Sequence, residues 1–340
     1  MFALAFGIGT KAADGQWLEV FYPRPLLNPA AATFKAITDV FGNDDANRWV
    51  EPDHAQLLAL HAALTNIDAD LAELCATLAN SVKPIVLTLL ASDAKPTSVP
   101  EVYLKLHLLS HRLARPHTLN LDGMFGALPN VAWTSEGAVA LNELPAAQLK
   151  ARLAGKPLEV TSVDKFPKMT DYVVPTGVRI ADTARVRLGA YIGEGSTIMH
   201  EGFVNFNAGT EGPAMIEGRI SAGVFVEASS DLGGGCSILG TLSGGNKTVI
   251  SVGKNCLIGA NAGLGIPLGD RCTIEAGLYL TAGSKVSMLD KTGNEVRICK
   301  ALELAGVSDL LFRRNSQTGR VECLTNKSEI ELNAELHSHN

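Results

Sequence analysis

A six-residue beat of apolar residues constrains the fold of this chain more than any other feature. It runs through Val174, Ile180, Val186, Ile192, Ile198 and Val204, and it resumes at Ile220, Val226, Leu232 and Ile238. After a second interruption it continues through Val252, Ile258 and Leu264, and a four-residue step restarts it at Leu268, Ile274, Leu280 and Val286. Because six is not a multiple of the 3.6-residue helical period, the beat excludes an α-helical origin.

Glycine follows many residues of this beat, at Gly193, Gly253, Gly259, Gly265 and Gly269. Short strands separated by such turns, three to a coil, would stack the apolar residues into one continuous core. We therefore expect a left-handed parallel β-helix built from hexapeptide repeats. Its two interruptions, after Asn205 and after Leu239, are expected to loop outward, and insertions of this kind commonly lie on the binding face.

The first half of the chain has a different pattern. From Pro29 to about Ser110 the apolar spacing is helical, the strand-like runs LAFGIGT and WLEVFYP precede it, and NVAWTSEGAVAL and PAAQLKARLAG follow it. We predict an α+β multidomain protein with an α-rich N-terminal domain over residues 1–160. The β-helix would cover residues 161–288, and a short C-terminal extension over residues 289–340 would end in a helix.

Charge, hydropathy and cysteine content narrow the function further. The net charge of -6 argues against nucleic acid as a partner, because phosphate binding needs a basic surface. No apolar run reaches the roughly 20 residues of a membrane span, so we expect a cytoplasmic protein without membrane contact. The six cysteines form no C-x-x-C pair, which favours reduced and mostly buried thiols.

One pair of histidines has a spacing that is compatible with a metal site. His107 and His111 are four residues apart in the predicted helix YLKLHLLSHRL, a spacing that could present two imidazoles to one ion. No glutamate accompanies them as it does in H-E-x-x-H, and histidine beside leucine on a helix is more often a packing residue. We therefore predict a packing role.

Longer strings in the chain resemble one family. They are SVDKFPKMTDYVVP, RVRLGAYIGEG, MHEGFVNFNAGTEGPAMIEGR, SDLGGGCSILGTLSGG, LIGANAGLGIPLGD and DLLFRRNS. Together they are similar to the tetrahydrodipicolinate N-succinyltransferases, in the branch typified by pseudomonads and actinobacteria, and the likeness covers almost the whole chain. The resemblance implies a homotrimer that transfers succinyl from succinyl-CoA to the amino group of ring-opened tetrahydrodipicolinate, in lysine and diaminopimelate biosynthesis.

The resemblance places the catalytic residue at Glu217, in MIEGR. It would act either as an acyl-anhydride nucleophile or as a general base, and amide formation from a thioester has use for both. The residues alone would instead favour a simple ion pair between Glu217 and Arg219, worth under about 1 kcal/mol at an exposed site.

The resemblance also implies a Mg²⁺ ion on the trimer axis, held by Glu201 in MHEGF. One carboxylate from each of three subunits would make a hard-oxygen site. Part of the branch adds an aspartate where this chain has Ala184, so the alternative of a solvated loop acid stays open for Glu201. We interpret the neighbouring His200 as a loop residue rather than as a histidine base.

For succinyl-CoA, the family's contacts carry over to Arg219, Gly234, Ser237, Ala260, Glu275, Ala276, Gly283, Lys300, Arg313, Arg314, Asn315 and Ser316. Glycines 233 to 235 would let backbone amides approach a thin pantetheine arm, and the cations would meet CoA's phosphates. A solvated basic turn is the alternative for Arg313 and Arg314. From spacing only, we expect Arg179, Arg185 or Arg187 to anchor the acceptor's two carboxylates.

Two other functions stay open at this point. One is a hexapeptide acyltransferase that uses another acyl donor or amine acceptor. The other is a β-helix without catalytic activity that serves only as a scaffold.

Overall fold

The structure is a computed structural model that describes residues 1–42, 46–242 and 248–325. The chain forms two compact units. Unit 1 comprises Met1–Pro167 with Asp171–Val173, and unit 2 comprises Lys168–Thr170 with the chain from Val174 onward. The helix expected at the C-terminus lies outside the described residues. Within them, no helix combines the length and apolarity needed to cross a membrane.

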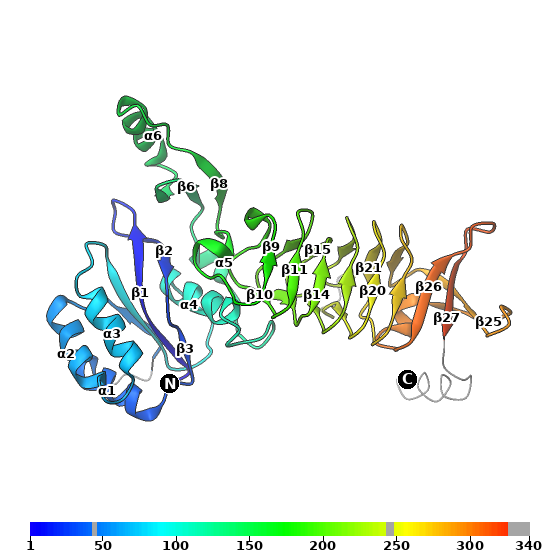
Figure 1. Cartoon of the computed structure of the whole chain (residues 1–340), viewed down its shortest axis with the longest axis horizontal. Helices are drawn as coiled ribbons and strands as arrows, with labels where there is room; N and C mark the ends of the chain where they lie inside the picture. The colour runs from blue at the N-terminus through cyan, green and yellow to red at the C-terminus, as the bar shows by residue number, and fades with distance from the viewer. Residues whose placement is uncertain (43–45, 243–247, 326–340) are drawn as a thin grey trace. The chain divides into compact units, whose positions relative to one another are not determined.

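An antiparallel sheet organises unit 1 (Figure 1). Its strands run in the order β2-β1-β5-β4, with β3 paired to β1. They are β1 (Ala3–Lys11), β2 (Trp17–Phe21), β3 (Leu26–Leu27), β4 (Arg48–Val50) and β5 (Ile85–Leu90). The two strand-like runs are confirmed as β1 and β2. The sequence analysis missed β5, a continuous apolar run that is buried along its whole length and lacks the alternation of a half-buried strand.

Helices cover both faces of this sheet. They are α1 (Ala31–Phe41), α2 (His54–Leu64), α3 (Ala69–Leu78) and α4 (Val99–Ser110). The first three pack on the face that carries Leu4, Phe6 and Leu87. The opposite face carries Thr88, whose hydroxyl is 2.7 Å from the Tyr22 hydroxyl, and Tyr22 also donates to Pro100 O in α4. Because successive side chains of a strand point to opposite faces of the sheet, α4 packs on one face and the other three helices pack on the other.

Helix α4 is buried along its entire length, charged residues included. The Lys105 ammonium is fully buried, and it donates to Asp93 at 2.6 Å and to the carbonyls of Ala94 and Asn120 at 2.7 Å. The Glu101 carboxylate accepts from the Thr97 amide and the Ser98 hydroxyl. These charges are satisfied inside the fold, as buried charges must be.

The remainder of unit 1 is a small three-stranded sheet in the order β7-β6-β8 with two helices. Its elements are α5 (Met124–Ala127), β6 (Val131–Thr134), β7 (Gly137–Ala140), α6 (Leu144–Leu153) and β8 (Val160–Asp164). The predicted strand region and short helix of this segment are thereby confirmed. Trp133 Nε1 donates to Asp164 O at 3.0 Å and links β6 to the end of β8.

Unit 2 is a parallel β-helix, in agreement with the predicted fold class (Figure 1). Its first sheet contains β10 (Ala190–Ile192), β13 (Ala208–Thr210), β16 (Phe225–Val226) and β19 (Ser251–Val252). Its second contains β12 (Phe203–Val204), β15 (Arg219–Ile220), β18 (Ser237–Ile238), β21 (Gly263–Gly265) and β23 (Tyr279–Thr281). The coil strands of the third are β9 (Arg179–Ile180), β11 (Ser196–Ile198), β14 (Ala214–Ile216), β17 (Asp231–Leu232), β20 (Leu257–Ile258) and β22 (Thr273–Ile274).

The apolar beat forms the core of these coils, with two corrections. Val174 is not part of it, because its side chain is 70% exposed. The expected outward loop after Asn205 is also wrong: the chain there forms β13 and β14, and Thr210 and Ile216 are fully buried in the ladder. The six-residue pattern of apolar residues was not visible here, because the residue at the buried ladder position is the polar Thr210. After Leu239, by contrast, the chain does leave the coil, with an antiparallel bridge between Thr241 and Val249.

The last part of unit 2 extends the third sheet with antiparallel pairs. Its strands are β24 (Lys285–Leu289), β25 (Glu295–Lys300), β26 (Leu310–Arg314) and β27 (Val321–Thr325), with the 3-10 helix η3 (Ala301–Leu304) between them. Phe312 of β26 pairs with Ile274 and places this hairpin as the next layer of the coil. All six cysteines are free and buried, as the sequence predicted.

Candidate active site

One corner of the β-helix gathers most of the predicted site residues. It directly follows the third sheet, whose ladder pairs Ile198 with Ile216, then Leu232, Ile258, Ile274 and Phe312. The residue after each ladder residue donates its amide to the ladder residue of the next coil, which stacks the turns. We call this line of turns the corner stack, and it comprises residues 199–202, 217–218, 233–235, 259–261, 275–277 and 313–316.

Two carboxylates converge within the corner stack. A Cβ atom placed on Gly234 would lie 3.6 Å from Oε2 of Glu201 and 3.6 Å from Oε2 of Glu217. The two oxygen atoms are therefore separated by no more than twice this distance. Among the described residues, neither carboxylate accepts a hydrogen bond or forms an ion pair, so the suggested pairing of Glu217 with Arg219 does not form. Glu201 is exposed, and Glu217 is half-buried.

Backbone amides line the same corner. The turns at Gly235, Asn261 and Gly277 have φ of 69°, 55° and 73°, a left-handed conformation that glycine and asparagine adopt most readily. Within the part of the chain that the structure describes, the amides just before them, at residues 234, 260 and 276, have no hydrogen-bond acceptor. Three coils in succession thus present an unpaired N–H group, which is a row of donors for a ligand.

Arg219 and Ser237 lie on the neighbouring second sheet, where they pair in register. The next residues of that row are Gly263 and Tyr279. The Tyr279 ring covers Gly263 so closely that a Cβ there would lie 2.3 Å from the ring. Arg219 and Ser237 therefore flank the corner stack rather than belong to it.

The segment DLLFRRNS forms β26 and the turn after it. The Arg313 guanidinium donates through Nε to Glu322 at 2.9 Å, and the Asn315 amide donates to the same carboxylate at 2.7 Å. The hydrogen bond from Asn315 and the interaction with Arg313 lower the pKa of Glu322. The Glu275 carboxylate accepts from the Arg314 amide at 2.7 Å. Glu275 thus holds the hairpin onto the coil, whereas Arg313 and Asn315 tie the two strands of the hairpin together.

Gly283 and Lys300 lie together beyond the last regular coil. Ser284 O accepts from the Ala301 amide, and Ala282 O accepts from the Leu302 amide, on either side of Gly283. Lys300 pairs in register with Lys285 across β24 and β25, and both are exposed. Like charges directly opposite each other are destabilising unless an anion lies between them. The sequence analysis missed Lys285, because only the antiparallel pairing reveals it.

The three arginines expected to bind the acceptor differ in their surroundings. Arg185 donates to the carbonyls of Glu201 and Gly202, and Arg187 donates to Asn205 Oδ1 at 3.1 Å. Arg179 is exposed on β9. His200 is exposed on the same turn as Glu201, in keeping with its interpretation as a loop residue.

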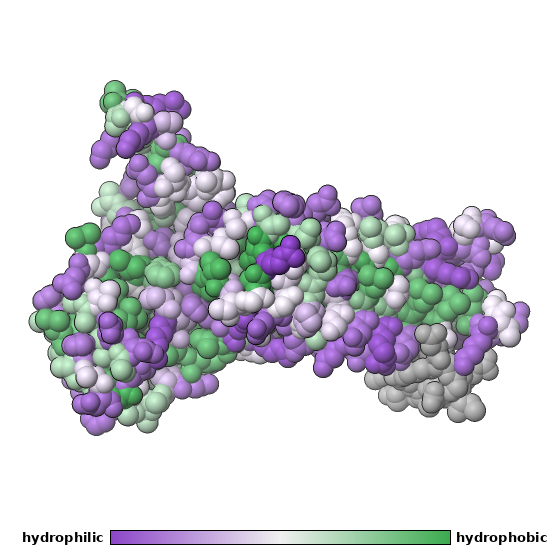
Figure 2. Space-filling view, in the orientation of Figure 1, coloured by the Kyte–Doolittle hydropathy of each residue, from purple (hydrophilic) through white to green (hydrophobic). Residues whose placement is uncertain are grey.

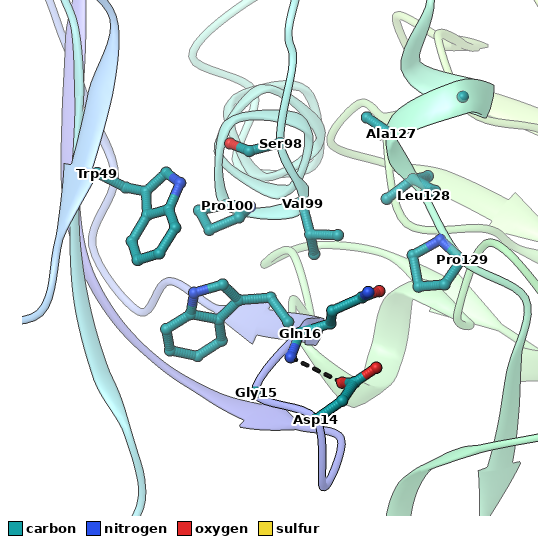
Figure 3. Close-up of a pocket in the computed structure, with 12 residues that line it drawn as sticks. Asp14, Gly15, Gln16, Trp49, Ser98, Val99, Pro100, Ala127, Leu128 and Pro129 are labelled. Carbon is teal, nitrogen blue, oxygen red and sulfur yellow. Dashed lines mark hydrogen bonds between the residues drawn. The ribbon is translucent and has the colours of Figure 1, made fainter. Parts of the chain in front are cut away.

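Two cavities lie apart from the corner stack. One, of about 560 Å³ in unit 1, is lined by Trp17, Trp49, Val99, Pro100 and Leu128, among others (Figure 3). The other, of about 510 Å³ in unit 2, is lined by Arg271, Thr273, Asp309 and Leu311, among others. None of the predicted site residues lines either cavity. The exposure of Glu201, Glu275 and Ala276 places the candidate site on the surface of the coils.

In the histidine pair of unit 1, His107 is occupied by the fold. His107 Nδ1 is 2.7 Å from Tyr103 O, and Nε2 accepts from the Tyr22 amide at 3.2 Å. Burial lowers the pKa of His107 to about 3, so the ring is neutral. Both of its nitrogens are in use, which supports the packing role.

The fold and this site define a hexapeptide-repeat acyltransferase. The chain matches three family models: the hexapeptide repeat of succinyl-transferase over residues 249–282, and the N-terminal and middle parts of tetrahydrodipicolinate N-succinyltransferase over residues 53–126 and 128–168. The chain therefore belongs to the tetrahydrodipicolinate N-succinyltransferase family, as the following relatives also show.

The 2,3,4,5-tetrahydropyridine-2,6-dicarboxylate N-succinyltransferase of Pseudomonas putida is 65% identical over 340 residues, covering 100% of this chain and 99% of the relative. That of Vibrio cholerae is 59% identical over 342 residues, with the same coverage. A crystal structure of a putative 2,3,4,5-tetrahydropyridine-2-carboxylate N-succinyltransferase from Campylobacter jejuni superimposes with a TM-score of 0.89. It has 31% identity, and the match covers 96% of this chain and 92% of that one.

Proposed function

We propose that this chain transfers succinyl from succinyl-CoA to the amino group of ring-opened tetrahydrodipicolinate, giving N-succinyl-2-amino-6-oxopimelate and CoA, in lysine and diaminopimelate biosynthesis. The observation that carries the site assignment is the convergence of two unpaired carboxylates on Gly234, at one end of a row of unpaired amides. In a member of this family, such a corner suits a thioester that lies along the coils.

The donor would extend along the corner stack. The amides of Gly234, Ala260 and Ala276 can donate to the carbonyl groups of a pantetheine arm, and Arg219 and Ser237 would flank its reactive end. At the far end, Lys300 and the turn of Arg313, Arg314, Asn315 and Ser316 would meet the phosphates, with Gly283 and Glu275 beside them. Lys285 joins this group, because an anion would relieve its repulsion with Lys300.

The chemistry needs a site for the oxyanion and a path for one proton. The amine nitrogen bonds to the thioester carbon, the carbon–sulfur bond then breaks, and the proton lost from nitrogen ends on the CoA sulfur. The Gly234 amide would donate to the oxyanion, and the amides of Ala260 and Ala276 would remain for the pantetheine arm. On this direct route Glu217 takes the proton as a general base. On the alternative route the Glu217 carboxylate attacks the thioester carbon and CoA leaves as thiolate; the amine then attacks the anhydride, Glu217 is released as carboxylate, and the amine proton passes to the thiolate.

The activity is tested by following thiol release from succinyl-CoA in the presence of the dicarboxylate acceptor. The six buried cysteines keep the background of such an assay low. Equal rates with acetyl-CoA would favour another acyl donor, and no release with either thioester would favour a scaffold without activity. Without acceptor, a burst of thiol equal to the enzyme concentration identifies the anhydride, whereas no burst identifies the general base.

The homotrimer is part of the proposal. Exposed apolar side chains lie on the outer face of the third sheet, next to the corner stack: Met215 is 38%, Leu257 50% and Leu311 37% exposed. Figure 2 colours such residues green along the coils. Another copy packed there would cover them and close the open side of the site. Sedimentation equilibrium should give three times the chain mass, and Leu257→Glu should yield smaller, inactive species.

The proposal extends to a Mg²⁺ ion at the trimer axis. Glu201 offers an exposed carboxylate, but a single chain has no group of three histidine, cysteine or acidic residues that could hold an ion, within the residues described. Three copies could supply three carboxylates, which fits the hard-oxygen preference of Mg²⁺. Metal analysis of wild type and Glu201→Gln tests this directly, since only the wild type should retain the ion.

A further inference from the structure

We infer that Arg185 is a positioning residue that fixes the carboxylate of Glu201 beside Glu217. The inference rests on the proposed function for the role of these two glutamates, but not for the contacts of Arg185. Arg185 ends the 3-10 helix η2 (Thr183–Arg185), one coil before the turn that carries Glu201. Its spacing in the sequence predicts an anchor for the acceptor, and its contacts in the structure are with the turn of Glu201.

The Arg185 guanidinium holds the Glu201 turn by its backbone. Nη2 donates to Glu201 O at 2.9 Å, and Nε donates to Gly202 O at 3.3 Å. The planar fork of arginine suits two neighbouring acceptors, which the single ammonium of lysine cannot match. The guanidinium carbon also lies 5.8 Å from the centre of the Phe203 ring, within range of a cation–π interaction.

The other backbone groups of the turn that carries Glu201 are already fixed, so that the carbonyls of Glu201 and Gly202 are the groups that Arg185 adds to this set. The Gly202 amide donates to Met199 O, and the Phe203 amide donates to Gly218 O. Any side chain at residue 202 would collide with Ile216 O, at 2.4 Å from the Cβ position. Arg185 therefore completes the set of contacts that fixes the turn, while the Glu201 carboxylate itself has no partner among the described residues.

The consequence is electrostatic as well as geometric. The place of the Glu201 carboxylate sets the negative potential at Glu217 and Gly234, where the thioester carbonyl would lie. Loosening the turn would let Glu201 swing away without removing any group that touches the substrate. Arg185 would thus act through Glu201, and its loss should lower kcat rather than raise the KM of the acceptor.

A double-mutant cycle tests this. We expect Arg185→Gln to lower kcat by up to about 10², the cost of misplacing a group at the site by about 1 Å, with an acceptor KM within about twofold of wild type. Arg185→Lys should recover part of the loss. In a Glu201→Gln background, Arg185→Gln should have no further effect. A raised acceptor KM at unchanged kcat, an equal loss in both backgrounds, or no loss at all would overturn the inference.

A second measurement does not depend on the reaction. In Arg185→Gln, amide hydrogen exchange over residues 199–203 should be faster than in the wild type, while exchange in the coils around Ile258 stays unchanged. Unchanged exchange in the turn would overturn the positioning role even in an active enzyme. A wild type that releases no thiol, but whose turn loosens on substitution, would instead refute only the proposed function.

Discussion

Helix α4 and the Gly234 end of the corner stack both carry charged side chains, but these charges have partners in α4 and none at Gly234 among the described residues. In α4, Lys105 and Glu101 are buried, and each is met by several partners from neighbouring loops. In the corner stack, Glu201 and Glu217 approach each other with no partner among the described residues. Charges satisfied within a fold stabilise it, whereas charges left unsatisfied are available to a ligand. The same residue types are therefore satisfied by the fold in one unit and left open to a ligand in the other.

Removing Glu217 should give the largest effect. We expect Glu217→Ala to lower kcat by about 10² to 10⁴, the range for loss of a general acid or base, with an unchanged melting temperature. Glu194→Ala is the matched control, because Glu194 is an exposed glutamate on the same β-helix but outside the corner stack. If Glu217→Ala kept most of its turnover at saturating substrates, the catalytic assignment would fail.

Lys105 tests whether the buried, partnered charges of α4 stabilise the fold. Lys105→Ala leaves Asp93 and two part-buried carbonyls without their fully buried donor, so we expect a loss of about 3–5 kcal/mol in the free energy of unfolding. Lys35 forms an exposed ion pair with Asp39 four residues on, and Lys35→Ala should cost about 0.3–0.5 kcal/mol. Chemical denaturation measures both. Similar losses would mean that burial does not distinguish the two lysines.

Two glycines in the corner stack allow a further test of which residues serve packing and which serve ligand binding. At Gly259 a Cβ would lie 2.4 Å from Ala276 N, so Gly259→Ala should destabilise unit 2 by about 1–3 kcal/mol. At Gly234 it would meet only the two carboxylates, at 3.6 Å. Gly234→Ala should therefore melt like the wild type and bind succinyl-CoA more weakly. The reverse order of melting temperatures would contradict this packing.

The smallest effect concerns acid stability. Because the pKa of Glu322 is lowered from its ordinary value of 4.5, its hydrogen bonds to Asn315 and Arg313 stabilise the hairpin above that pH. This stabilisation is lost as the pH falls through the lowered pKa. Glu322→Gln should melt at a lower temperature than the wild type at neutral pH, and the gap should narrow below pH 4.5. A constant gap would argue against a role for this charge.

The sequence predicts the repeated part of this fold better than the parts that make it specific. The beat specified the coils, because every buried position faces the same interior. It failed at Thr210, where a buried hydroxyl replaces an apolar residue, and in unit 1 it offered nothing to reveal β5. The family resemblance supplied Glu217 and Gly234, whereas their convergence with Glu201 depends on how turns 16 or 18 residues apart stack. Lys285 emerges only from strand pairing, and the contact of Arg185 with the Glu201 turn only from the structure.

The number of coils in the corner stack also sets the distance between its two ends. The turn of Glu217 and the turn of Arg313 are four coil steps apart, through Leu232, Ile258 and Ile274. Neighbouring strands are about 4.8 Å apart, so these steps span roughly 19 Å. The number of coils, rather than any one side chain, would then decide how far the phosphates of a donor lie from its reactive carbonyl. A chain with one coil more or fewer between these turns would be matched to a donor of a different length.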